Sequence, residues 1–240
     1  MKSLLLMVTG IWCFAADAAW SREASVPNRW GVYIADVVSG KVRLMGDFTD
    51  WELSPNGRLI AGGSNVGTSN TFYEVSVVST LPESTRQLER FPVDEEWDAS
   101  FHWSSDSARV CVETDRNNDG KREFKTFSVG RASTTRPPKI PRRHLSASAM
   151  RRLKARYPHI SYVAFSPGGT RVVAYLSRSS YEKANYDGGL WMFTPDGRNL
   201  KRLTRNSPLP HHDFFDVEPR WLPDGKRLAF RRTSFEDEGI

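Results

Sequence analysis

The sequence predicts an all-β fold made of about four similar four-stranded units. Three observations favour this fold: aromatic residues make up 12% of the 240 residues, long helical patterns are nearly absent, and one turn motif recurs along the chain. With 39% hydrophobic residues, the chain also carries too much large apolar surface for a disordered protein. Self-similarity at a fixed interval is typical of repeat folds.

The recurring motif has a large apolar residue, a tight turn, a basic residue and then an apolar strand. Its four copies are residues 53–61, 103–112, 165–174 and 221–230. Proline presets the backbone early in the turn, and glycine accepts the positive φ that closes it, at Pro55, Pro167, Pro223, Gly57, Gly169 and Gly225. Ser107 replaces this glycine in the second copy, so we expect that turn to be the least regular.

Each motif predicts one β-hairpin, and further strand pairs predict a second. These pairs are residues 190–193 with 199–204, 72–78 with 87–91, and 32–38 with 41–45. Two hairpins form a four-stranded unit, which is a β-propeller blade. We predict one propeller domain over residues 20–240, with repeats near 49–91, 97–130, 160–204 and 216–235 and an N-terminal hairpin at 30–46.

The motif Trp221-Leu-Pro-Asp-Gly-Lys-Arg-Leu-Ala-Phe230, with its relative at 165–174, resembles the TolB-like (PD40, WD40-like) propeller repeat. The segment Leu190-Trp-Met-Phe193 followed by Asp196-Gly197 and Asn199-Leu200 completes the resemblance, which covers roughly residues 29 to 235. It implies a propeller fold. It says little about function, because propellers serve as scaffolds, binding platforms and enzymes.

The two ends of the repeat region are complementary. The chain begins with an outer-type hairpin (32–45) and ends soon after an inner-type hairpin (220–231). We predict that these half-blades pair and close a ring of about four blades, which removes open sheet edges. The alternative is a partial propeller, in which the 240 residues are a piece of a longer ring.

The N-terminus predicts export. Lys2, an apolar run from Leu4 to Ala16 and the small residues of Ala16-Asp17-Ala18 are typical of a cleaved signal peptide, here residues 1–18. The alternative is a buried N-terminal strand or helix. Export implies a periplasmic or secreted protein with no transmembrane segment after cleavage, and it leaves Cys111 as its one cysteine.

A polar loop between two expected strands predicts a Ca²⁺ site. Asp115, Asn117 and Asp119 supply oxygen ligands at alternate positions, Gly120 permits a sharp bend, and the Lys121 backbone and Glu123 follow at positions seven and nine. Such an ion would be structural. The alternative is an ordinary hairpin loop, since Asp, Asn and Gly favour turns in any case.

A basic insertion at residues 131–159 separates the second and third repeats. It holds nine Lys or Arg and no Asp or Glu, whereas the whole chain has a net charge of +6. Its second half predicts a short helix after Ser146. Its cations could bind an envelope protein or an anionic glycan or lipid surface; candidate residues are Arg142, Arg143, Arg151, Arg152, Lys154 and Arg156. The alternative is a solvated loop. Nucleic acid is disfavoured, because no aromatic residues are interleaved for base stacking.

His211 and His212 precede the fourth motif and are weaker candidates for binding, since adjacent side chains on a strand point to opposite faces. The sequence has no Gly-x-Ser-x-Gly, His-Glu-x-x-His or paired Cys-x-x-Cys motif, and we identify no catalytic residue and no organic cofactor. We therefore favour a non-enzymatic binding scaffold of the cell envelope. The alternatives are a polysaccharide lyase or glycosidase, or the gating propeller of a peptidase system.

Overall fold

The computed structural model describes residues 30–66, 72–81, 84–93, 99–114, 122–130, 144–178, 188–204, 207–209 and 212–234. The first sheet contains β3 (Asp50–Leu53), β4 (Leu59–Val66), β5 (Phe72–Ser79) and β6 (Thr85–Pro92). The second contains β7 (Ala99–Trp103), β8 (Arg109–Thr114) and β9 (Glu123–Ser128). The third contains β10 (His159–Phe165), β11 (Val172–Ser177), β12 (Gly188–Phe193) and β13 (Lys201–Arg202), with α1 (Ala147–Lys154) before it.

The fourth sheet joins the two ends of the described chain. It runs in the order β14 (Ser207–Leu209), β15 (His212–Trp221), β16 (Arg227–Ser234), β1 (Gly31–Asp36) and β2 (Val42–Gly46). β1 pairs with β16 from Gly31↔Arg232 to Asp36↔Arg227. The two terminal hairpins therefore lie in one sheet, as expected; β14 adds a strand that the sequence did not predict.

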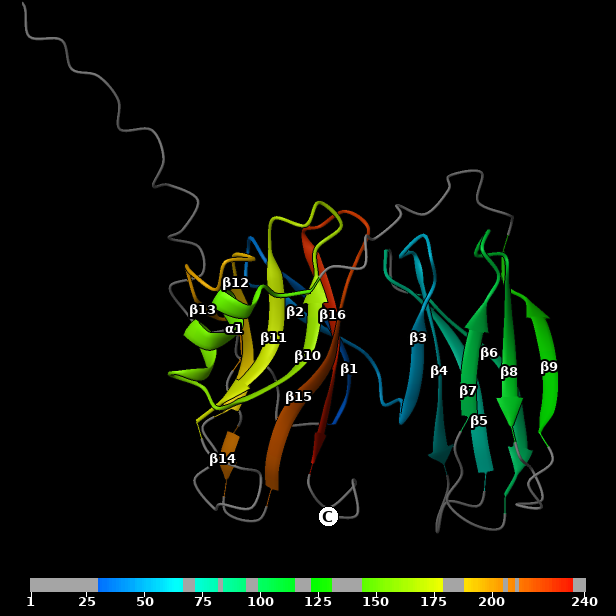
Figure 1. The fold of residues 1–240 in the computed structure, drawn as a ribbon. Coiled ribbons are helices and arrows are strands. Elements are labelled where there is room, and N and C mark those ends of the chain that lie inside the picture. Colours follow the sequence, from blue (N-terminus) through cyan, green and yellow to red (C-terminus); the bar gives the residue numbers. More distant parts are fainter. Residues whose placement is uncertain are drawn as a thin grey trace, which may run out of the picture.

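All strand pairs in these four sheets are antiparallel, and consecutive strands lie side by side within each repeat (Figure 1). Four separate antiparallel sheets of this kind make an all-β, propeller-like fold. This confirms the predicted fold class at that level.

The four predicted turns have the same backbone geometry. Gly57, Gly169 and Gly225 adopt φ of +68°, +67° and +63°, the left-handed region that glycine enters without steric cost. Ser107 adopts φ of +60° at the same place in the second copy, so the turn forms there despite the missing glycine. Its hydroxyl accepts a hydrogen bond from the Asn56 backbone N–H at 3.1 Å, which links the first two turns.

Apolar residues of neighbouring sheets form three shared cores. One lies between the β10–β13 sheet and the sheet that holds β15, β16 and β1, with Tyr175 and Phe230 among its members. A second joins β1 and β16 to β3, β4 and β5, and a third joins the β3–β6 sheet to β7 and β8. The sheets therefore pack in a series, with β7–β9 and β10–β13 at its two ends (Figure 1).

Among the described residues, no such core joins the β7–β9 sheet to the β10–β13 sheet. The number of blades and the closure of a ring stay predictions.

The residue before each turn helps to hold the sheets together. Trp103 at the end of β7 donates its indole N–H to the Glu52 carbonyl of β3 at 3.1 Å. Trp221 at the end of β15 makes the equivalent bond to the Ala164 carbonyl of β10 at 3.2 Å. The large apolar residue of the motif thus contacts the preceding repeat in both cases.

A buried ion pair lies inside the fourth sheet. Arg232 of β16 donates from Nε and Nη2 to the two carboxylate oxygens of Asp216 on β15, at 2.7 and 2.8 Å. The side chains are only 2% and 0% exposed. Two charge-assisted hydrogen bonds between the buried guanidinium and carboxylate offset part of the cost of removing both charges from water, and they connect β15 to β16.

Candidate functional site

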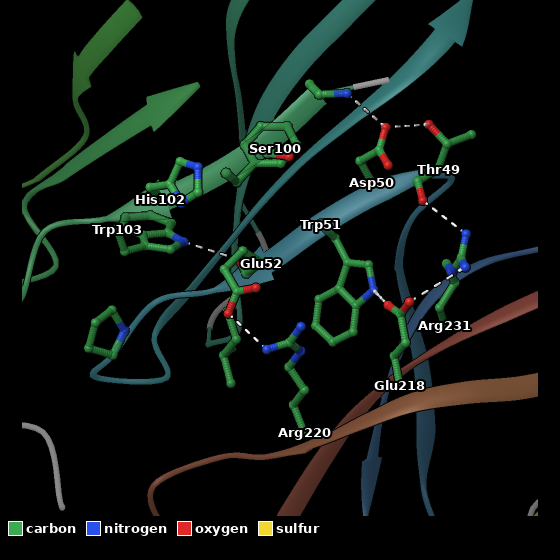
Figure 2. A pocket seen from close by; sticks show the side chains of 14 residues that line it. Thr49, Asp50, Trp51, Glu52, Ser100, His102, Trp103, Glu218, Arg220 and Arg231 are labelled. Carbon is green, nitrogen blue, oxygen red and sulfur yellow. Dashed lines mark hydrogen bonds and ion pairs between the residues drawn. The ribbon is translucent and has the colours of Figure 1, made fainter. Parts of the chain in front are cut away.

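A pocket of about 610 Å³ lies where β3, β7 and β15 come together. These strands precede the recurring turns of three different repeats, so the pocket belongs to no single sheet (Figure 2). It is lined by Thr49, Asp50, Trp51, Glu52, Leu53, Pro55, Ala99, Ser100, Phe101, His102, Trp103, Glu218, Arg220 and Arg231. Its wall therefore mixes aromatic rings, carboxylates and guanidinium groups.

Trp51 connects two sheets across the pocket. Its indole N–H donates to Glu218 Oε2 at 3.2 Å, and Figure 2 shows the ring pointing from β3 toward Glu218 of β15. Arg231 Nη2 lies 3.6 Å from Glu218 Oε1, and Arg231 also donates to the Thr49 carbonyl at 3.1 Å. One carboxylate thus accepts from an indole and faces a guanidinium, which fixes its orientation.

The backbone at Glu218 is unusual for this residue type. Glu218 adopts φ of +54°, at an irregularity in the pairing of β15 with β16 between Val217 and Arg220. β10 has the same irregularity, with Tyr162 at φ of +53°. A bulge of this kind redirects side chains out of the regular alternation, and on β15 it serves to bring both Glu218 and Arg220 into the pocket.

Glu52 and Arg220 form the second cross-sheet pair of the pocket. Arg220 Nη1 lies 3.0 Å from Glu52 Oε1, and its guanidinium lies 5.5 Å from the centre of the Trp51 ring. Burial raises the pKa of Glu52 above its ordinary value. The nearby Glu218 carboxylate also raises this pKa, whereas Arg220 and His102 lower it without offsetting the burial.

Asp50 anchors the back of the pocket. Its Oδ2 accepts hydrogen bonds from the Tyr73 hydroxyl at 3.0 Å and from the Ala99 backbone N–H at 3.2 Å. Tyr73 and Ala99 are buried and belong to β5 and β7. Asp50 therefore ties the β3–β6 sheet to the β7–β9 sheet.

The β7 side of the pocket carries an exposed histidine. His102 Nε2 shares a hydrogen bond of 2.8 Å with Glu113 Oε2 of β8, and Arg122 pairs with the other oxygen of the same carboxylate. The Arg122 and His102 contacts lower the pKa of Glu113. His102 thus has a fixed acidic neighbour and an exposed face at the rim of the pocket.

The predicted Ca²⁺ loop is only partly described. Asp115, Asn117, Asp119 and Lys121 lie outside the described residues, while Glu123 begins β9 and is exposed. Thr114 of β8 pairs with Glu123, so the loop connects two adjacent antiparallel strands. The described part of the chain contains no group of three or more His, Cys, Asp or Glu that could hold a metal ion. Calcium binding stays a prediction.

The other predicted binding residues are not in the pocket. Arg151, Arg152 and Lys154 are exposed on α1, and Arg156 is exposed just after it. Arg142, Arg143 and His211 lie outside the described residues; His212 begins β15, and its side chain is not described either.

Sequence reasoning missed the pocket residues, although they carried a signal. Glu52, His102 and Arg220 each stand one residue before the apolar residue of the motif, and Asp50 and Glu218 stand three before it. Charged residues recurring at fixed positions in strands that pack between sheets indicate a common polar centre.

No family model matches the chain. One curated protein, the uncharacterized peptidase YuxL of Bacillus subtilis (strain 168), is 33% identical over 67 residues, which are 28% of this chain and 9% of that protein. Among solved structures, the tricorn protease is 12% identical with a TM-score of 0.30, over 86% of this chain and 23% of that one. An ancestral GH74 enzyme is 12% identical with a TM-score of 0.24, over 78% and 25%. None of these likenesses assigns an activity to this chain.

Over the ranges that the structure describes, no helix is long and apolar enough to cross a membrane.

Proposed function

We propose that this chain is an exported, TolB-like, non-enzymatic binding scaffold of the cell envelope, which holds its ligand in the pocket between β3, β7 and β15. The pairing of the pocket's charged groups supports this proposal most directly. Glu52 pairs with Arg220, and Glu218 accepts from Trp51 and faces Arg231. Groups that are already oriented before a ligand arrives lose little conformational freedom on binding.

The charge of the pocket favours a polar ligand without a strong net charge. The three carboxylates of Asp50, Glu52 and Glu218 nearly balance the guanidinium groups of Arg220 and Arg231. Such paired donors and acceptors, beside tryptophan rings, suit hydroxyl or amide groups, as in a neutral glycan or an uncharged protein segment. A strongly anionic ligand would meet these carboxylates at close range.

A thermal-shift screen tests the proposal. Neutral oligosaccharides and uncharged peptides are added to the wild type, to Arg220→Gln and to a control, Arg198→Gln, whose side chain is exposed far from the pocket. We expect at least one probe to raise the Tm of the wild type and the control, but not of Arg220→Gln. A probe that stabilises all three proteins equally contradicts binding in this pocket.

A second candidate function is glycoside hydrolysis, which one observation favours. Glu52 has a raised pKa, and Glu218 provides a second carboxylate in the same pocket. Most glycosidases use two carboxyl groups, of which the acid has a raised pKa. Turnover of nitrophenyl glycosides by the wild type, lost in both Glu52→Gln and Glu218→Gln, would replace the scaffold proposal with this one.

The proposal includes a closed ring of about four blades. Small-angle X-ray scattering tests this part, because a compact domain of this length has a radius of gyration of about 18 Å. A clearly larger value for the monomer contradicts closure.

Calcium is a structural element of the proposal. Titration calorimetry of the wild type with Ca²⁺ is expected to give heat that Asp119→Ala loses; absence of heat in the wild type removes calcium from the proposal.

A further inference from the structure

A second charged surface lies at the β10–β13 end of the series of sheets, away from the β7–β9 sheet. It is formed by α1 and the β10–β13 sheet (Figure 1). Residues 144–178 contain six Lys or Arg and no Asp or Glu. All six are exposed, and we call four of them, Arg151, Lys154, Arg156 and Arg178, the basic face.

The helix that carries half of this face is fixed in place. Ser146 caps α1 by accepting from the Ala149 N–H at 3.1 Å, and Ala149 and Leu153 are buried against the sheet. Arg152 donates to the Asp196 carbonyl in the β12–β13 turn at 3.0 Å. The outer side of α1 therefore presents Arg151 and Lys154 from a defined position.

Two cations from separate segments converge beside the helix. The guanidinium groups of Arg156 and Arg178 lie 5.6 and 5.7 Å from the centre of the Tyr157 ring. Tyr157 is 1% exposed and packs against Trp191, with ring centres 5.1 Å apart. The buried Tyr157 ring thus contacts two guanidinium groups from separate segments. Within the described ranges, no carboxylate forms an ion pair with Arg156 or Arg178.

We propose that the basic face binds an acidic polysaccharide. The planar guanidinium of arginine recognises carboxylate or sulfate groups through paired hydrogen bonds. The four cations of the basic face, none of which forms an ion pair with a described carboxylate, provide the complementary charge. The apolar side of α1 packs against the sheet, so the helix has no apolar surface for insertion into a lipid bilayer. Tyr157 points inward, so it offers no stacking platform for nucleobases.

Binding is measured with polygalacturonate and a heparin oligosaccharide at low salt, together with single-stranded DNA and anionic phospholipid vesicles. The variant is Arg151→Gln, Arg156→Gln, Arg178→Gln. A matched control, Arg58→Gln, Arg90→Gln, Arg109→Gln, removes the same charge from exposed positions in the β3–β6 and β7–β9 repeats. We expect the wild type and the control to bind a polysaccharide, and the variant to bind about tenfold or more weakly.

Equal weakening in both triple variants would overturn the proposal, because it would show a response to net charge alone. Binding of vesicles or DNA without binding of either polysaccharide would also overturn it. The Tm of each variant separates a loss of binding from a loss of the stabilising contact between cations and the C-terminus of α1. The proposal stands apart from the pocket, so the variant should keep any probe binding found there.

Discussion

Breaking the buried Asp216–Arg232 pair should destabilise the protein strongly. Asp216→Asn removes the negative charge from a fully buried carboxylate that binds a guanidinium only 2% exposed, so it breaks a buried ionic contact inside the sheet. Removing one member of a buried pair costs about 3–5 kcal/mol in the free energy of unfolding. For a chain of this size, each kcal/mol lowers the Tm by about 2–4 °C, so we expect a fall of about 6–20 °C.

Urea denaturation followed by tryptophan fluorescence measures this effect, with calorimetry for the Tm. The control is Asp196→Asn, which breaks an ion pair whose side chains are 67% and 54% exposed and should leave the midpoint unchanged. The double variant Asp216→Leu, Arg232→Met should recover much of the loss, because it leaves no buried charge. The reasoning is refuted if Asp216→Asn unfolds at the same urea concentration as Asp196→Asn.

Three further predictions, with four substitutions, test the pocket and the turns. Burial raises the pKa of Glu52, so the contribution of this carboxyl group to stability is fully present below about pH 4.5 and is lost as the pH rises through the pKa of the folded state. In urea titrations from pH 4 to 7, the wild type should therefore lose stability relative to Glu52→Gln. A stability difference between the two proteins that stays constant with pH would contradict this. Gly225→Ala should lower the free energy of unfolding by about 1–2 kcal/mol because of its φ of +63°. Gly57→Ala should lower it further, since the added Cβ would lie 2.2 Å from Pro223 Cδ. Equal urea midpoints for the two variants would contradict this prediction. Trp103→Phe should cost about 1 kcal/mol, because it removes the donor to the Glu52 carbonyl, and an unchanged midpoint would show that this bond adds nothing.

The local features of the fold were readable because neighbouring residues decide them. The turn at Gly57 follows from the conformational freedom of glycine, and the Ser146 cap from the hydroxyl that accepts the Ala149 N–H. The same turn at Ser107 shows the limit of this reasoning. There, the surrounding hairpin and the contact with Asn56 hold a residue that would not choose a positive φ by itself.

The candidate pocket was not predicted because its parts are distant in the chain. Trp51 and Glu218 are 167 residues apart, and a hydrogen bond at that separation depends on which sheets pack together. The bulge on β15 also decides which way Glu218 and Arg220 point, and no local rule places a glutamate at φ of +54°. The charged residues before each turn could be found in the sequence, but the sequence did not show that their strands come together around one pocket.

The sequence by itself determined the strands apart from β14, the recurring turns, the capped helix and the excess of positive charge near α1, because hydrophobic alternation, turn chemistry and charge act over a few residues. Only the tertiary structure decided which strands share a pocket and that Arg156 and Arg178 meet at one buried ring. These outcomes depend on how the sheets bury their apolar faces against one another, and that packing is a property of the whole chain.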